Sequence, residues 1–314
     1  MEHGINRRRL LGAAIGTGVV ATGAGAWTPA ALGSGRGRGA RNGVPPNRRG
    51  IQLYTMRRLI EEARQTPAQV FSALGRMGYT EVETAGHYDL TAAELRGQLD
   101  RAGLRAISGH DGPDFNFPTG WQTGYRATME YAVELGQELT GFAWFPGPYD
   151  NADYYRFLAE RFNEAGAIAR EHGLQFFYHN HNFEFDNRQA NGRPMYDILL
   201  EETDHSLVKF ELDLFWITEG GASGVEYLSA DPARYVAYHV KDHVWGDRLN
   251  EADFEDAGPG MLDFPDLFAA GQGRGLDKHF FIEHDSPWLS HPDDPQAEYK
   301  TARAGIEYLR TVHW

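Results

Sequence analysis

Two histidines and a glutamate follow a short apolar run near the middle of the chain. His179 and His181 lie two residues apart, directly after the run 174–178, and Glu184 follows three residues later. Imidazole nitrogens and carboxylate oxygens are atoms with which proteins bind divalent cations such as Zn²⁺ and Mn²⁺. A strand that merely ends in hydrogen-bonded histidines would show the same residues, so the choice between the two interpretations depends on the other strands.

The next three apolar runs along the chain carry further residues of these types, namely Asp213, His239 and Glu283. Charged side chains are rarely buried without a partner, so a group of them at one edge of a sheet requires a compensating cation. A single histidine of this kind is more often a hydrogen-bonded core residue. The joint pattern instead favours a divalent metal site, with Asp213, His239 and Glu283 as ligands.

Side-chain parity indicates which of these residues share a face of the sheet. Residues two apart on a strand point the same way. The pairs related in this way are His179 with His181, Glu211 with Asp213, His239 with Lys241, and Glu283 with Asp285. Parity leaves open which of His179 and His181 binds the metal.

Four other residues near the expected strand ends are candidates for substrate contacts. Glu83 and His110 can hydrogen bond to substrate hydroxyl groups, Lys241 can hold a substrate oxygen, and the ring of Trp216 can pack against an apolar face of a substrate. Each also has a structural interpretation. Glu83 and His110 would then bond within the core, Lys241 would form a salt bridge, and Trp216 would be a packing residue.

Strand-type and helical segments alternate from residue 50 to the C-terminus. Most strand segments are nearly continuous apolar runs, which is typical of parallel strands buried on both faces. Helix signals lie between them, such as Thr66 before a proline and the capping-box pattern from Thr91 to Glu94. The strand segments are 50–56, 79–85, 104–110, 139–145, 174–180, 207–216, 235–242 and 279–285.

Eight such units predict an α/β fold, a single (β/α)8 TIM barrel over residues 50–314. An open doubly wound sheet is the alternative, but no G-x-G-x-x-G follows the first strand segment. In a TIM barrel the chemistry collects at the C-terminal ends of the strands. The candidate residues above fall at those ends.

The first 34 residues have the features of an export signal. Arg7, Arg8 and Arg9 precede an apolar run rich in Gly and Ala, as in a cleavable signal peptide. The segment 6–11 resembles a twin-arginine signal, so we expect the twin-arginine export machinery to carry the protein to the periplasm or the exterior. An uncleaved membrane anchor is the alternative. Residues 35–49, rich in Gly, Arg and Pro, are expected to form a flexible linker.

The predicted barrel domain is strongly acidic. Without residues 1–50, which hold eight Arg and one Glu, the chain keeps 22 basic and 43 acidic residues, a formal charge of −21. Such a surface repels polyphosphates, so nucleic-acid binding is not expected. The chain has no cysteine, which excludes disulfides, thiolate metal ligands and a catalytic thiol.

Residues 50–314 resemble the sugar phosphate isomerase/epimerase family, whose members have a xylose-isomerase-like barrel. The resemblance spans the barrel from end to end, and it is specific as a series rather than in any one stretch. The matching stretches are GIQLYTMR, GYTEVETAGHY, AGLRAISGHDG, YHNHNFEF, FELDLFWI, YHVKDH, AGPGMLDFPDLF and FIEHD.

The resemblance implies one divalent metal ion, Mn, Zn, Co or Mg, bound by residues from the last four strands. The family uses a Glu, an Asp, a His and a Glu, and the last three match Asp213, His239 and Glu283. Strand five departs from this pattern, because His179 stands where the family has its Glu. We expect His179 to be the fourth ligand, with Glu184, the nearest carboxylate, as the alternative.

This departure changes the expected acid and base. The family's two metal-bound glutamates move a proton to and from the carbon beside a carbonyl group. Here either His179 binds the metal and Glu283, His181 or His110 transfers the proton, or His179 is itself the base. Lys241 is a candidate to stabilise the enolate oxygen.

These expectations describe a metal-dependent sugar isomerase or epimerase that abstracts a proton next to a carbonyl group. An exported enzyme meets few sugar phosphates, so the expected substrate is an unphosphorylated sugar or keto-sugar. A dehydratase or lyase shares the first step, and a non-catalytic sugar-binding protein is a further alternative. The acidic charge disfavours a metal-dependent nuclease on the same barrel. The expected partner is a small carbohydrate, and the sequence leaves a homo-oligomer open.

Changing Arg7 and Arg8 together to Lys should trap the uncleaved precursor inside the cell, because Lys does not reproduce the guanidinium pair. Cell fractionation followed by immunoblotting measures this. Changing Arg36 and Arg38 to Lys, in the predicted linker, is the matched control and should leave export unchanged. Normal export of the Arg7 and Arg8 variant would show that the twin-arginine interpretation is wrong.

Overall fold

The computed structural model describes residues 42–62, 64–113, 115, 120–244, 254–271 and 277–314. The chain separates into the segment Met1–Ala40 and one compact unit, Arg41–Trp314. All the described residues belong to the second unit. The predicted export signal, residues 1–34, and the first part of the predicted linker lie outside the described residues.

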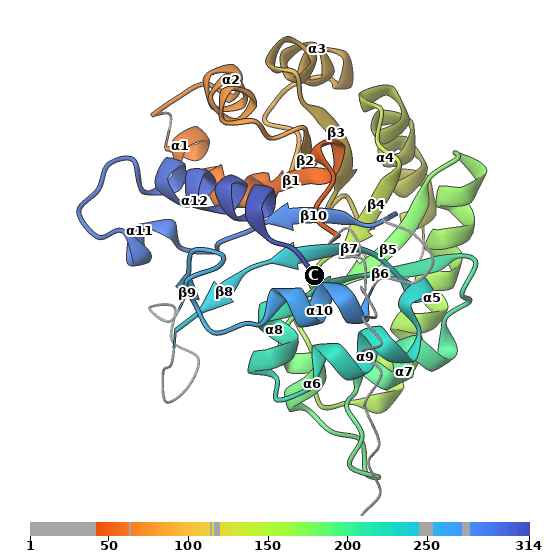
Figure 1. Cartoon of the computed structure of the whole chain (residues 1–314). Coiled ribbons are helices and arrows are strands. Elements are labelled where there is room, and N and C mark those ends of the chain that lie inside the picture. The colour runs from red at the N-terminus through yellow and green to blue at the C-terminus, as the bar shows by residue number, and fades with distance from the viewer. Residues whose placement is uncertain (1–41, 63, 114, 116–119, 245–253, 272–276) are drawn as a thin grey trace, which may run out of the picture. The chain divides into compact units, whose positions relative to one another are not determined.

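Eight parallel strands form one sheet that is nearly closed into a barrel (Figure 1). The hydrogen-bonded order is β3-β2-β1-β10-β7-β6-β5-β4, so β3 and β4 are the two ends of the sheet. A backbone hydrogen bond from Glu138 N to Ile107 O (2.9 Å) connects these ends beside the start of β4. The strands are β1 (Arg49–Gln52), β2 (Glu81–Thr84), β3 (Arg105–Gly109), β4 (Leu139–Phe142), β5 (Gln175–His179), β6 (Val208–Asp213), β7 (Tyr235–Val240) and β10 (His279–Ile282). The predicted TIM barrel is confirmed.

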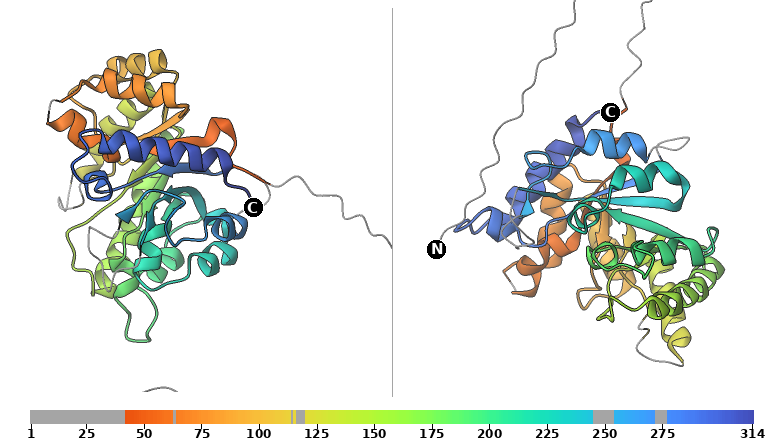
Figure 2. Two further views of the ribbon diagram at one scale, coloured as in Figure 1. Left: turned by 60° about the vertical axis from the view of Figure 1, so that its left-hand side comes forward. Right: turned by 90° about the horizontal axis from the view of Figure 1, so that it is seen from below.

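Helices between the strands cover the outside of the barrel (Figure 2). They are α1 (Arg57–Glu61), α2 (Pro67–Met77), α3 (Ala92–Ala102), α4 (Trp121–Leu135), α5 (Ala152–Glu171), α6 (Phe183–Asp186), α7 (Tyr196–Glu202), α8 (Leu214–Glu219), α9 (Gly224–Ala230), α10 (Phe264–Ala270), α11 (Pro287–Ser290) and α12 (Ala297–Thr311). Short 3₁₀ turns cover Pro46–Arg48, Leu53–Met56 and Pro232–Arg234. A small antiparallel pair, β8 (Asp242–His243) and β9 (Phe254–Glu255), follows β7.

Two helix starts follow directly from local sequence. The side chains of Thr66 and Thr91 accept hydrogen bonds from the backbone three residues on, and both form capping boxes. A cap of this kind satisfies backbone donors that the first helical turn leaves free, and it contributes about 1 kcal/mol. The capping predictions for α2 and α3 are therefore confirmed.

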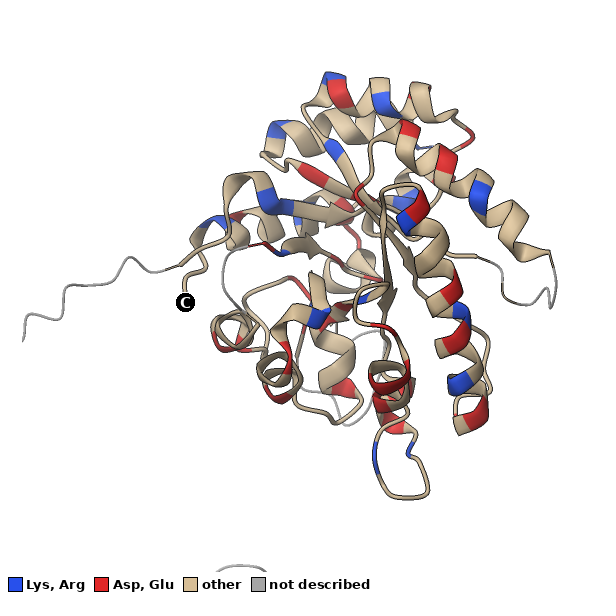
Figure 3. Cartoon of the chain, turned by 90° about the vertical axis from the view of Figure 1, so that its right-hand side faces the viewer, with Lys and Arg blue, Asp and Glu red and all other residues tan. Residues whose placement is uncertain are grey.

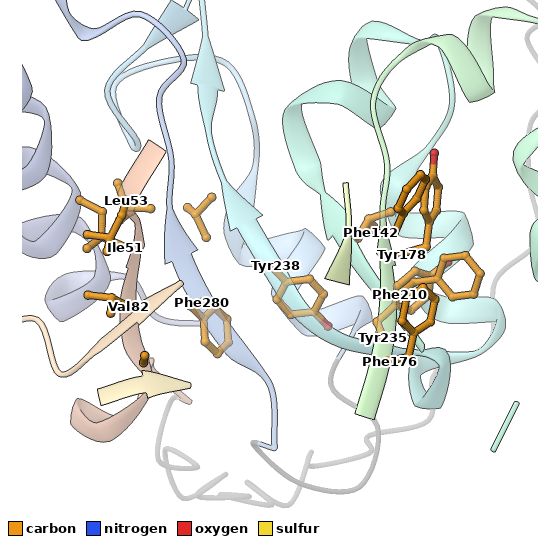
Figure 4. Packing of buried hydrophobic residues seen from close by; sticks show 14 of the residues in the cluster. Ile51, Leu53, Val82, Phe142, Phe176, Tyr178, Phe210, Tyr235, Tyr238 and Phe280 are labelled. Atoms are coloured by element: carbon orange, nitrogen blue, oxygen red, sulfur yellow. The ribbon is translucent and has the colours of Figure 1, made fainter. Parts of the chain in front are cut away.

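The outward faces of the strands pack against the helices through large apolar side chains (Figure 4). Phe176 and Tyr178 on β5, Phe210 on β6 and Tyr238 on β7 are all buried. Burying a side chain of this size contributes about 1.5–3 kcal/mol. Since residues alternate between the two faces of a strand, these side chains fix which neighbours point into the barrel.

An apolar layer fills the barrel interior beneath the C-terminal ends of the strands. Ile107 and Phe281 belong to a small buried cluster there. Gly50 and Gly141 lack a side chain for a steric reason, because a Cβ on them would overlap the rings of Phe281 and Phe177, respectively. We call this layer the apolar floor, and the polar residues at the strand ends lie above it.

Two of the predicted strand segments change to helical structure part-way. The segment 50–56 divides into β1 and a 3₁₀ turn, and the side chain of Gln52 accepts a hydrogen bond at the junction. The segment 207–216 divides into β6 and α8, because Asp213 Oδ1 accepts a hydrogen bond from Trp216 N (2.8 Å). β6 therefore ends at the candidate ligand Asp213, and β1 ends just before Tyr54.

Residues 42–49 belong to the barrel unit, although we expected a flexible linker there. Asn42 and Trp314 exchange two backbone hydrogen bonds of 3.1 Å, and Gly43 forms a β-bridge with His313. β1 itself already begins at Arg49. Backbone pairing with the C-terminus thus orders this stretch, which its Gly and Pro content could not indicate.

Acidic and basic residues are interspersed along the outer helices (Figure 3). Exposed pairs such as Arg58–Glu62 (2.8 Å) are screened by solvent and contribute little to stability. No helix among the described residues is both long and apolar enough to span a membrane.

Replacing Gly75 with Ala should destabilise the barrel, because its Cβ would overlap the carbonyl of Ala102 where α2 packs on α3. We expect a loss of about 1–3 kcal/mol in the free energy of unfolding, measured by urea denaturation. Gly124→Ala is the matched control, since Gly124 is an exposed residue of α4 with nothing near its Cβ position. That change should stabilise the protein by about 0.5–1 kcal/mol. Equal stability of Gly75→Ala and wild type would contradict this close contact.

Candidate active site

A cavity of about 420 Å³ lies at the C-terminal end of the barrel, where TIM barrels carry their active sites. It is lined by Tyr54, Ala85, His110, Ala143, Trp144, His179, His181, Glu283 and Asp285. A larger groove of about 630 Å³ lies beside α2 and α12, but no candidate metal ligand lines it. The smaller cavity is therefore the candidate active site.

Asp213, His239 and Glu283 lie together beside this cavity. One ligand atom from each lies within 4.8 Å of the others, and all three residues are buried. His239 Nδ1 is 2.9 Å from Glu283 Oε2 and 3.7 Å from Asp213 Oδ2. β6, β7 and β10 position them, with Asp213 and His239 paired in register. We call these three residues the upper group.

Lys241 lies between the two carboxylates of the upper group and that of Asp285. Its Nζ is 3.1 Å from Asp213 Oδ2, 2.7 Å from Glu283 Oε2 and 2.9 Å from Asp285 Oδ2. Burial disfavours the ammonium, but the three carboxylates outweigh this effect and raise the pKa of Lys241 well above its usual value. Burial likewise disfavours the Glu283 carboxylate, but Lys241 and His239 hold its pKa well below the usual range. This ion pairing keeps both groups charged.

The opposite edge of the His239 ring faces two other carboxylates. Its Nε2 lies 2.7 Å from Glu83 Oε1 and 3.0 Å from Glu211 Oε2. A metal-bound histidine usually has a carboxylate on its second nitrogen, which fixes the ring. These contacts fix the ring so that its Nδ1 faces Glu283 and Asp213.

A second group of metal-ligand atoms lies around Glu211. It consists of His110, His179, Glu211 and His239, again with one ligand atom from each within 4.8 Å of the others. His179 Nδ1 is 3.1 Å from Glu211 Oε2. The ring nitrogen of His179 therefore lies with Glu211. His179 is not a member of the group formed by Asp213, His239 and Glu283, for which we expected it to be the fourth ligand.

His181 lies beyond the end of β5, and its ring lines the cavity beside His179 with the two ring centroids 5.1 Å apart. Its Nδ1 is buried and has no hydrogen-bond partner among the described residues. Burial, reinforced by the positive charge of Lys241, lowers the pKa of His181 to about 3. The ring is therefore neutral at ordinary pH, and its Nδ1 is not engaged in a hydrogen bond with any described residue.

Glu184 is turned away from both ligand groups. It accepts a hydrogen bond from the hydroxyl of Tyr178, and His181 N donates to its carboxylate at 3.0 Å. Burial outweighs these bonds and raises the pKa of Glu184 to about 8. Tyr178 points outward from the barrel, and its hydrogen bond holds Glu184 outside the cavity. The bond from His181 N shows that Glu184 stabilises the turn after β5.

The predicted substrate residues fall into two sets. His110 and His181 line the cavity, whereas Glu83, Lys241 and Trp216 are not among its lining residues. Glu83 instead accepts hydrogen bonds from Gln52 (2.6 Å) and Ser108 (2.5 Å). Trp216 packs beside Lys241, whose Nζ is 5.1 Å from its ring centroid. These three residues contact other site residues but do not line the cavity.

His110 bridges two of the buried carboxylates. Its Nε2 lies 3.0 Å from Glu83 Oε1 and 3.1 Å from Glu211 Oε2. Burial opposes protonation of His110, but these carboxylates outweigh it and raise its pKa to about 10.

Sequence reasoning did not assign a role to Glu211 or to Tyr54, which lies at the cavity. Parity placed Glu211 on the same face as Asp213, and this was the signal that could have identified it. Tyr54 carried no such signal, because it follows β1 in a 3₁₀ turn.

The upper group fits a divalent cation. Asp213 Oδ2 is buried, and apart from its ion pair with Lys241 Nζ (3.1 Å) it accepts no hydrogen bond from a described residue. Burial raises the pKa of Asp213 to about 6, so the carboxylate lacks sufficient partners. A cation beside this oxygen would satisfy it, and two carboxylates with one imidazole are a common ligand set.

A family model described as "Xylose isomerase-like TIM barrel" matches residues 71–312. The chain belongs to this family. Among curated proteins, inosose dehydratase of Clostridium perfringens is 26% identical over 163 residues, which cover 47% of this chain and 54% of that protein. The match thus spans about half the length of the dehydratase.

Solved structures of the same fold support this assignment. A sugar phosphate isomerase/epimerase from Parabacteroides distasonis is 23% identical with a TM-score of 0.68, covering 84% of this chain and 93% of that one. The IolI protein with a bound zinc atom is 14% identical with a TM-score of 0.61, covering 83% and 97%. At these identities the likeness shows the fold alone.

Comparing wild type with Glu184→Gln should reveal the raised pKa of Glu184. The folded protein keeps its proton up to about pH 8, whereas the unfolded chain loses it above about pH 4.5. Wild type should therefore lose stability relative to Glu184→Gln as the pH rises between these values, on the order of 1 kcal/mol per pH unit. Urea denaturation at several pH values measures this difference. A difference that is independent of pH would contradict the buried, protonated carboxyl.

Proposed function

We propose that the protein is a metal-dependent isomerase or epimerase that moves a proton at the carbon beside a carbonyl group of an unphosphorylated sugar or keto-sugar. The observation that carries the proposal is the unpartnered, neutral His181 ring in a cavity next to the upper group. His181, the candidate proton acceptor, and Glu283, one residue of the candidate cation site, thus line the same cavity of about 420 Å³.

Asp213, His239 and Glu283 would hold the cation, which supplies polarisation of the substrate carbonyl. His181 would accept the proton, because its ring lines the cavity together with Glu283 and its Nδ1 has no competing partner among the described residues. For this step the bound substrate would have to raise the pKa of the ring from about 3 toward the working pH. Lys241 keeps Glu283 ionised and orients it toward His239. His110 lies on the cavity wall and would bind a substrate hydroxyl.

The cavity lining supports an unphosphorylated substrate. None of the described residues that line it is Lys or Arg, whereas phosphate sites normally use such side chains or a helix N-terminus. Trp144 and Tyr54 stand at the cavity with exposed fractions of 55% and 41%. Such rings can pack against the apolar face of a sugar.

A dehydratase is the second candidate, favoured by Asp285. Elimination begins with the same proton abstraction, but a general acid must then protonate the departing hydroxyl group. Asp285 lines the cavity, and burial raises its pKa even though Lys241 opposes the effect. The sequence match to a protein named inosose dehydratase is consistent with this alternative.

Export through the twin-arginine machinery remains part of the proposal. It rests on Arg7, Arg8 and the apolar run that follows them. An exported enzyme would act on carbohydrates outside the cytoplasm, in agreement with a cavity that lacks a phosphate-binding cation among its described lining residues.

Purified protein loaded with Mn²⁺ or Zn²⁺ should exchange a substrate C–H proton in deuterated water. NMR against a panel of ketoses, inososes and keto-sugars would detect the exchange and separate epimerisation from loss of water. His181→Gln should lower the exchange rate by roughly 100-fold or more. His205→Gln, on a largely exposed histidine outside the cavity, is the matched control. Undiminished exchange in His181→Gln would remove His181 from the reaction.

A further inference from the structure

Three imidazole rings converge on one carboxylate oxygen in the barrel interior. Glu211 Oε2 lies 3.1 Å from His110 Nε2, 3.1 Å from His179 Nδ1 and 3.0 Å from His239 Nε2. The ring centroids are 4.5–5.6 Å apart. The three nitrogens come from β7, the end of β5 and the residue after β3, so the barrel itself sets their positions.

We propose that His110, His179, Glu211 and His239 form a second divalent-cation site, separate from the upper group that the proposed function uses. We call it the deep site. It would take an imidazole-binding ion such as Zn²⁺ or Co²⁺, because three of its four donors are ring nitrogens. The upper group, with two carboxylates, would more readily take Mn²⁺ or Mg²⁺.

Hydrogen bonds alone satisfy this arrangement poorly. A carboxylate oxygen has two lone pairs, yet three ring nitrogens approach Glu211 Oε2 at nearly equal distances. The Nε2 atoms of His110 and His239 also approach Glu83 Oε1, so each would share one N–H between two acceptors. Meanwhile Glu211 Oε1 is buried and has no hydrogen-bond partner among the described residues. A central cation would use the nitrogen lone pairs directly.

The number of buried carboxylates also favours a cation at the deep site. Glu83, Glu211, Asp213 and Glu283 are buried carboxylates, at most 7% exposed, and Lys241 is the buried ammonium among them. One divalent cation in the upper group and the Lys241 ammonium supply three positive charges against these four carboxylates, and the fourth is balanced either by a protonated His110 or by a cation at the deep site. A second divalent ion at the deep site would compensate the remaining carboxylate in an interior where unpaired charge is costly.

His239 connects the two sites. Its Nδ1 faces the upper group, and its Nε2 faces Glu211. The two cations would therefore lie on opposite edges of one ring, and binding both would release the ring proton to solvent. The apolar floor lies directly below, with the Phe177 ring centroid 6.0 Å from that of His110. The deep site is thus closed on its lower side by hydrocarbon.

Metal stoichiometry tests the deep site without any assay of activity. The full-length protein is stripped with a chelator, loaded with Zn²⁺, Co²⁺ or Mn²⁺, desalted and measured by inductively coupled plasma mass spectrometry. Wild type should hold two equivalents after loading with Zn²⁺ or Co²⁺. Glu211→Gln and His110→Ala should each lose one equivalent, whereas Asp213→Asn should lose the other and keep the deep ion.

The second equivalent of Co²⁺ gives an independent spectroscopic signature. Co²⁺ bound at the deep site should show the intense visible absorption of a four-coordinate ion. This absorption should be present in wild type and Asp213→Asn and absent in Glu211→Gln. Glu81→Gln is the matched control, because Glu81 is a buried carboxylate that pairs with Arg105 (2.8 Å) and His279 (2.7 Å) away from both groups. It should retain two equivalents, which separates metal loss from general destabilisation.

One equivalent in wild type that is unaffected by Glu211→Gln would overturn the deep site. Two equivalents that both survive His110→Ala and Glu211→Gln would do the same. These outcomes are distinguishable from failure of the proposed function, since absence of proton exchange leaves the stoichiometry unchanged.

Discussion

Buried negative charge is the constraint on which the C-terminal end of this barrel depends. Four carboxylates converge there, and water cannot solvate most of their surface. An uncompensated charge in such a place costs several kcal/mol, so each carboxylate must face a cation or a hydrogen-bond donor. Lys241 and the histidine rings supply part of this compensation. Asp213 Oδ2 accepts no hydrogen bond beyond its ion pair with Lys241, and three ring nitrogens converge on Glu211 Oε2. These are the two positions at which the proposed cations would bind.

The apolar floor makes this charge arrangement effective. The rings of Phe177 and Phe281 fill the barrel where Gly50 and Gly141 leave room for them. They separate the polar strand ends from the lower group of Glu81 and its partners. Because electrostatic interactions are stronger in a medium of low dielectric, small displacements of a ligand above the floor change its affinity considerably. The same surroundings keep the His181 ring neutral.

The strand and helix pattern could be predicted because it depends on local rules. Nearly continuous apolar runs located all eight strands, and capping residues such as Thr66 located helix starts. Parity also placed Glu211 and Asp213 on one face. It could not show that Glu184 would turn outward to Tyr178, because that depends on the turn after β5. Nor could it show the order of residues 42–48, which pair with the C-terminus.

The sequence by itself determined the barrel, the strand ends that carry polar residues, and the types of ligand available there. These properties follow from periodicity and residue chemistry, which need no knowledge of distant contacts. Only the tertiary structure decided how the ligands divide into two groups. His239 presents one nitrogen to each group, and His179 joins Glu211, because ring orientation and strand register are set by packing across the whole barrel.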